Sequence, residues 1–248
     1  MQDFYGDTPF IIDGKTSSHG KKNKTTIREK GVSGAFLAKL VVIFLVVAVV
    51  AGFVVFKKFF NVDIPAKTYY AVCFYSGQSK TQAESVCADL VASGGSGYTI
   101  SGGEYKVYGG VYADKGEAES VAAKQEGAFV ENIGWEKMRI TFSSPSEAKQ
   151  AGEAMDYFSE VCNALVRSSL NVDNQEESAA AVYAYVLSAA TRLESYADVL
   201  RSKELSDFFK KAAYSVGNVA PDEAQNFIST LRYAAQDLIV LRQNLAVG

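Results

Sequence analysis

Histidine is almost missing from this chain of 248 residues, and cysteine is scarce. The single histidine, His19, lies in the N-terminal tail, so the remainder cannot supply a His-ligated zinc site or a Ser-His or Cys-His catalytic pair. The three cysteines, Cys73, Cys87 and Cys162, are an odd number without a CxxC motif, which argues against a zinc knuckle and a full disulfide framework. We therefore expect no metal site and no cofactor.

Basic residues are in the minority over most of the chain. Residues 59–248 contain sixteen Lys and Arg against twenty-four Asp and Glu, a net charge of −8, whereas residues 1–58 contain nine against four, a net charge of +5. Nucleic-acid binding depends on clustered basic side chains that neutralise phosphates. We expect no nucleic-acid partner.

An uncharged apolar stretch, residues 40–56, follows the basic N-terminal tail. Phe36–Phe56 is long enough, at ~1.5 Å per residue, to cross a ~30 Å hydrocarbon core, and it is longer than the apolar region of a cleaved signal peptide. The sequence predicts a transmembrane signal anchor at 35–58 within the lipid bilayer. The basic bias before it predicts a disordered cytoplasmic tail at 1–34 and an extracytoplasmic remainder, which makes a single-pass protein of the cell membrane.

After an expected linker at 59–67, a strand-and-helix unit occurs twice, 35 residues apart. Further strand patterns at Tyr98–Ser101 and Phe129–Ile133 complete the order β-α-β-β-α-β. This order predicts a four-stranded antiparallel sheet with both helices on one face and the opposite face open. The matched segments are Tyr70–Val72 with Tyr105–Val107, and Ala83–Val86 with Ala118–Val121.

Strand alternation assigns side chains to the two faces of this sheet. Val72 is expected to face the helices, whereas Ala71, Cys73, Lys106 and Tyr108 are expected on the open face. Because Cys87 falls on a helix behind the sheet, a disulfide between Cys73 and Cys87 is not expected.

The two units resemble a known family. The run Tyr69–Tyr75 with its following Ala-Glu-Ser-Val helix, and Tyr105–Tyr112 with Glu-Ala-Glu-Ser-Val, are similar to the SPOR domain, the sporulation-related repeat. The resemblance covers residues 68–135, and we take 68–137 as a SPOR-like domain. It implies that the exposed sheet face binds peptidoglycan glycan strands stripped of stem peptides, at sites of bacterial cell division or sporulation.

Six residues are expected to form the glycan site. The resemblance places Ala71, Phe74, Lys106 and Tyr108 there. Tyrosine adds a flat apolar ring with a polar tip, which suits sugars, so Tyr69 and Tyr75 join Tyr108 as a platform. The alternative is that exposed tyrosines only reflect strand propensity.

Beyond a further strand at 138–142, the hydrophobic period becomes helical and predicts a bundle of three or four helices at 144–248. Ser144 with Glu147 predicts one helix start, Asp173 with Glu176 a second and Pro221 the last. The dipeptide Glu194-Ser195 resembles the catalytic pair of helical lytic transglycosylases, but the Gly-Leu-Met-Gln segment of that family is missing. We interpret Glu194 as a surface residue and expect no catalytic residue.

The predicted fold class is thus α+β: one transmembrane helix, a SPOR-like sheet domain and a helical bundle. The predicted function is a membrane-anchored, noncatalytic protein that binds denuded glycan strands of the cell wall, with the bundle contacting another envelope or divisome protein. Two alternatives stay open. One is a membrane-anchored glycan hydrolase, and the other is a structural interaction protein without sugar binding, since Ala71 and Phe74 depart from the family pattern.

Overall fold

The computed structural model describes residues 42–47, 49, 60–220 and 224–245. Residues 42–47 and 49 are helical, and the rest of the predicted tail and signal anchor lies outside the described residues. In the described part, no helix is both long and apolar enough to span a membrane. The predicted fold class, which begins with a transmembrane helix, is wrong in this respect. The described fold is α+β, with helices and two separate sheets.

Residues 67–135 form a four-stranded antiparallel sheet with two helices. The strands lie in the order β3-β4-β2-β5. Each helix has an N-cap residue whose side chain accepts a hydrogen bond from a backbone N–H of the first turn. This residue is Ser79 for α2 and Asp114 for α3. The elements are β2 (Lys67–Gly77), α2 (Lys80–Ala92), β3 (Tyr98–Ser101), β4 (Tyr105–Tyr112), α3 (Lys115–Ala122) and β5 (Phe129–Trp135).

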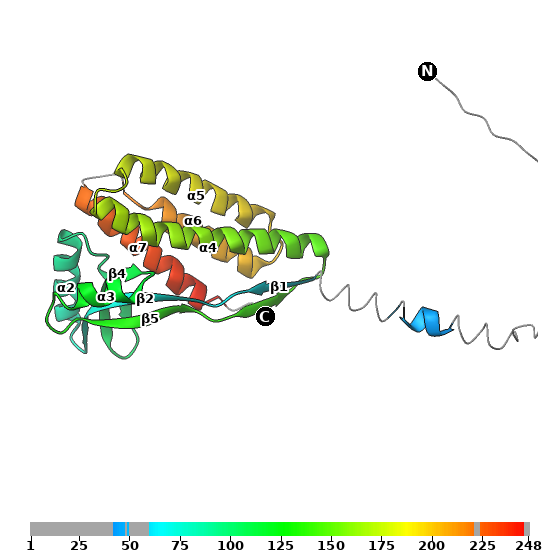
Figure 1. The fold of residues 1–248 in the computed structure, drawn as a ribbon, viewed down its shortest axis with the longest axis horizontal. Coiled ribbons are helices and arrows are strands. Elements are labelled where there is room, and N and C mark those ends of the chain that lie inside the picture. The colour runs from blue at the N-terminus through cyan, green and yellow to red at the C-terminus, as the bar shows by residue number, and fades with distance from the viewer. Residues whose placement is uncertain (1–41, 48, 50–59, 221–223, 246–248) are drawn as a thin grey trace, which may run out of the picture. The chain divides into compact units, whose positions relative to one another are not determined.

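A second sheet occupies part of the expected linker. Strand β1 (Asn61–Ile64) pairs antiparallel with β6 (Met138–Thr141), so residues 61–64 are a strand and not a linker. Arg139 and Asp63 lie opposite each other in this ribbon and form an ion pair with an Nε–Oδ1 distance of 2.7 Å. The ribbon continues the directions of β2 and β5 beyond the larger sheet (Figure 1).

Among the described residues, four helices follow the ribbon: α4 (Pro145–Asp173), α5 (Ala179–Val199), α6 (Lys203–Gly217) and α7 (Ala224–Gln243). The predicted start at Ser144 is confirmed, because its side chain accepts a hydrogen bond from the Glu147 backbone N–H. The predicted start at Asp173 is wrong. Asp173 is the last residue of α4, and the N-cap of α5 is Ser178. Pro221 lies outside the described residues.

Helices α4 and α7 cover the sheet face opposite α2 and α3 (Figure 1). Helix α7 packs against β3, β4 and β5, while α4 packs against β1 and β4. Helices α5 and α6 form the outer layer, packed on each other and on α4 and α7. One apolar core runs from Tyr69 and Val111 in the sheet to Leu193 and Leu238 in the bundle. The segments expected as separate modules at 68–137 and 144–248 therefore share a core.

Replacement of Leu231 in α7 tests whether the sheet and the bundle share one core. Its side chain is 0% exposed, so Leu231→Ala removes buried methyl groups and leaves a cavity. We expect the free energy of unfolding to fall by ~2–5 kcal/mol in urea denaturation followed by circular dichroism. Leu187→Ala on α5 is the matched control, because Leu187 is 47% exposed and its loss should be about 0.5 kcal/mol. Equal losses in the two variants would contradict the packing described.

Candidate functional site

The sheet face expected to bind sugar is closed by the bundle. Tyr69 and Ala71 are 0% exposed, and Tyr108 is 3% exposed. The Tyr69 ring contacts the ring of Trp135, and its hydroxyl donates a 2.8 Å hydrogen bond to Oδ1 of Asn163 on α4. The expectation of an open sheet face is wrong, because these three predicted glycan-binding residues belong to the core.

Phe74 lies on the other face of the sheet. It packs against the cluster that contains Val72 and Tyr112, next to α2 and α3. The pairing of β2 with β4 shifts register on both sides of Cys73, and Phe74 has no partner in that ladder. Its ring occupies the space where a side chain at Gly109 would lie, so Gly109 permits this close approach. Phe74 therefore cannot share a binding surface with Ala71.

Tyr75 and Lys106 are half-buried and already bonded within the protein. The Tyr75 hydroxyl donates to the carbonyl of Ser79 at 3.1 Å, at the start of α2. The Lys106 ammonium lies 2.6 Å from Oε1 of Glu131, whose Oε2 accepts a 2.5 Å hydrogen bond from the Tyr108 hydroxyl. The structure therefore does not bring the six predicted residues together as one exposed site.

A sequence signal for the covered face exists in β2. Residues 69–75 contain no charged side chain, and apolar or aromatic residues occupy both faces of the strand. Such a run is typical of a strand buried on both sides, whereas a half-exposed strand alternates apolar and polar residues. Alternation within β2 separates the side chains of its two faces, but it does not identify what packs on each face.

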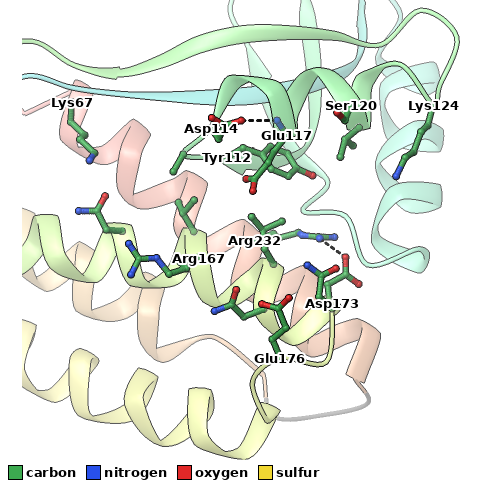
Figure 2. A pocket seen from close by; sticks show the side chains of 17 residues that line it. Lys67, Tyr112, Asp114, Glu117, Ser120, Lys124, Arg167, Asp173, Glu176 and Arg232 are labelled. Atoms are coloured by element: carbon green, nitrogen blue, oxygen red, sulfur yellow. Dashed lines mark hydrogen bonds and ion pairs between the residues drawn. The ribbon is translucent and has the colours of Figure 1, made fainter.

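A polar groove of about 830 Å³ lies between α3 and the C-terminal half of α4 (Figure 2). We call it the α3–α4 groove. One wall consists of α3 and the turn that precedes it, and the other consists of α4 and the residues just after it. Lys67 of β2 and Arg232 of α7 complete the lining.

Arg232 of α7 ties the α4 wall of the groove to neighbouring elements. Its Nη2 lies 2.7 Å from Oδ2 of Asp173 at the end of α4, and its Nη1 donates to the Gly94 carbonyl at 2.8 Å. The Arg232 side chain is 11% exposed and that of Asp173 is 50% exposed, so the guanidinium is largely buried while the carboxylate of the pair stays in contact with water. One guanidinium thus joins α7, α4 and the turn between α2 and β3.

The groove face of α4 carries a polar stripe. Asn163, Arg167 and Asn171 all line the groove and are spaced four residues apart, so they lie on successive turns of one helix side. Lys67 and Arg167 lie at the same end of the groove, and Glu117 points from α3 into the space between the helices (Figure 2). The stripe was missed because a polar face on an amphipathic helix ordinarily faces solvent.

The groove offers amides, ammonium and guanidinium groups and carboxylates, which together bind hydroxyl-rich or weakly charged ligands. Glu194, the residue considered for catalysis, is exposed on α5 as predicted and does not line the groove. No cluster of His, Cys, Asp and Glu within the described residues could hold a metal ion.

Comparison with family models, with curated proteins and with solved structures found no match for this chain.

Glu131, which is bonded to Lys106 and Tyr108, predicts how the stability of the fold depends on pH. Burial raises the pKa of Glu131, but hydrogen bonds from Lys106 and Tyr108 outweigh this and hold the pKa below its usual value. Because the folded-state pKa is the lower one, the stabilisation is present above the unfolded-state pKa of ~4.3 and is lost as pH falls through the folded-state pKa.

We expect Glu131→Gln to flatten the fall in unfolding free energy between about pH 5 and pH 3, measured by urea denaturation at each pH. Glu136→Gln, at an exposed position of the same chain segment, should keep the wild-type slope. A wild-type slope in Glu131→Gln would show that this carboxylate does not couple folding to pH.

Proposed function

We propose that this protein is a noncatalytic binding protein for cell-wall glycan strands, and that the α3–α4 groove holds the sugar. The observation that carries the proposal is the stripe of Asn163, Arg167 and Asn171 facing α3 across an open polar groove. The resemblance of residues 68–135 to SPOR domains supports the ligand class. The resemblance implies that the ligand binds on the sheet face. Because that face is buried, we place the ligand in the α3–α4 groove instead.

The chemistry of the groove suits a glycan strand. The Asn163 Oδ1 accepts from Tyr69 and the Asn171 Nδ2 donates to Glu177, which leaves the Asn163 Nδ2 to donate to a sugar hydroxyl and the Asn171 Oδ1 to accept from one. Glycan strands stripped of stem peptides also carry a lactyl carboxylate on each muramic acid residue. Lys67 and Arg167 are both exposed at one end of the groove and can pair with such a carboxylate.

The carboxylates of the groove favour binding over hydrolysis. A glycosidase needs a general acid that is held protonated by an apolar environment, together with a second carboxylate at a defined separation. Glu117 and Glu176 line the groove, but both are exposed to water. In our proposal these side chains accept hydrogen bonds from sugar hydroxyls.

Retention of the purified protein on peptidoglycan stripped of stem peptides tests the proposal. Lys67→Ala combined with Arg167→Ala should weaken retention at least about tenfold, because charge-assisted hydrogen bonds contribute ~1.5–3 kcal/mol each. Arg201→Ala is the control, since Arg201 is exposed and lies outside the groove. Circular dichroism of all variants verifies the fold.

Undiminished retention in the double variant would place the glycan elsewhere, and no retention of the wild type would reject glycan binding. The same samples are assayed for released sugar fragments. Fragment release that Glu117→Gln or Glu176→Gln abolishes would establish the hydrolase alternative instead.

A further inference from the structure

Arg242, near the end of α7, is a buried cation without a counterion among the described residues. It is 2% exposed, and its Nε and Nη2 have no hydrogen-bond partner within the described part of the chain. An arginine side chain remains protonated in proteins, so burial cannot neutralise it. A buried charge without a partner costs several kcal/mol of stability.

The two described groups that act directly on Arg242, the Trp135 ring and Cys162, do not supply a negative charge. Its guanidinium carbon lies 5.7 Å from the centre of the Trp135 ring, a cation–π contact that offsets only part of the cost. Cys162 also acts on it electrostatically, but burial raises the pKa of this thiol, which therefore stays neutral. Desolvation lowers the pKa of Arg242 itself, as expected where a counterion is missing.

Arg242 lines a pocket of about 630 Å³ between the end of α7 and the junction of β5 with β6. Trp135 and Met138 give this pocket apolar walls, and Glu136 and Lys137, both exposed, have opposite charges. Arg139 also lines it but is paired with Asp63. The charge left uncompensated is therefore the single positive charge of Arg242, which matches a monoanion.

The two unpartnered nitrogens point to the shape of that anion. Nε and Nη2 form one edge of a guanidinium, which binds both oxygens of a carboxylate. Arg139 uses this edge in the same protein: its Nε and Nη2 lie 2.7 Å and 3.2 Å from the two carboxylate oxygens of Asp63. The corresponding edge of Arg242 lacks such an acceptor among the described residues.

We propose that the pocket between α7 and the β5–β6 junction binds a small monocarboxylate, with Arg242 as the residue that takes the carboxylate and Trp135 and Met138 against its apolar body. Because the Nε–Nη2 edge is buried, binding requires the guanidinium to rotate toward the pocket. This site is separate from the α3–α4 groove and does not depend on the glycan proposal.

Trp135 is the one tryptophan of the chain and lines this pocket, so tryptophan fluorescence has a single source, beside the proposed site. The full-length protein is titrated with sodium butyrate and, separately, with neutral butyramide, at ionic strength held constant with sodium chloride. We expect a saturable change in emission with butyrate and at least about tenfold weaker binding of butyramide. Sodium sulfate, a dianion, should bind more weakly than butyrate. An equal response to acid and amide, or no response to either, would overturn the proposal.

Variants identify the residue that binds. Arg242→Met keeps an unbranched side chain of similar reach without the charge, and should abolish both the fluorescence response and the rise in thermal midpoint that butyrate gives the wild type. Arg242→Lys keeps the charge but loses the two-point contact, and should weaken binding about tenfold. Arg201→Met, at an exposed arginine outside both the α3–α4 groove and this pocket, should respond as the wild type does. A full response in Arg242→Met would overturn the assignment, and if that variant does not fold, an unweakened response in Arg242→Lys would overturn it instead.

Discussion

The packing of α7 across the sheet is the contact on which the rest of the structure depends. Apolar side chains form this contact, because Val111 of β4 and Leu231 and Leu238 of α7 belong to the same buried core. Polar bonds fix the position of the helix: Ser229 donates to the Gly95 carbonyl at 2.7 Å, and Arg232 donates to the Gly94 carbonyl. The helix therefore closes the second sheet face and also places Arg232 between the groove walls. A sheet with that face open could not form the α3–α4 groove as described.

Much of the secondary structure could be predicted because its causes are local. The strand at Tyr98–Ser101 follows a glycine-rich turn, and Ser144 with Glu147 marks the start of α4 through a single hydrogen bond. Asp173 shows the limit of local reasoning. It carries a suitable capping side chain, but the helix continues to it and its carboxylate is used by Arg232, while Ser178 caps α5.

The candidate site was not predictable in the same way, because its parts are distant in sequence. The groove joins α3 with α4 and Arg232, and each segment alone is an ordinary amphipathic or capped helix. The resemblance to SPOR domains predicted an exposed sheet face, but it covers no residue of the bundle that packs there. The apolar run of residues 69–75 indicates that both faces of β2 are covered, but it does not identify what covers them.

Arg232 and Arg242 lie on the same helix and differ in what surrounds them. Arg232 has a carboxylate and a backbone carbonyl as partners, so its charge is used to hold elements together and it is unsuited to bind a ligand without loosening the groove. Arg242 is more deeply buried and has an aromatic ring beside it but no acceptor for its free edge in the described part of the chain. Because an unpaired buried guanidinium is costly, a ligand that supplies two oxygens gains binding energy and also removes a source of instability. Helix α7 thus carries one arginine that stabilises the fold and one whose missing partner marks a binding site.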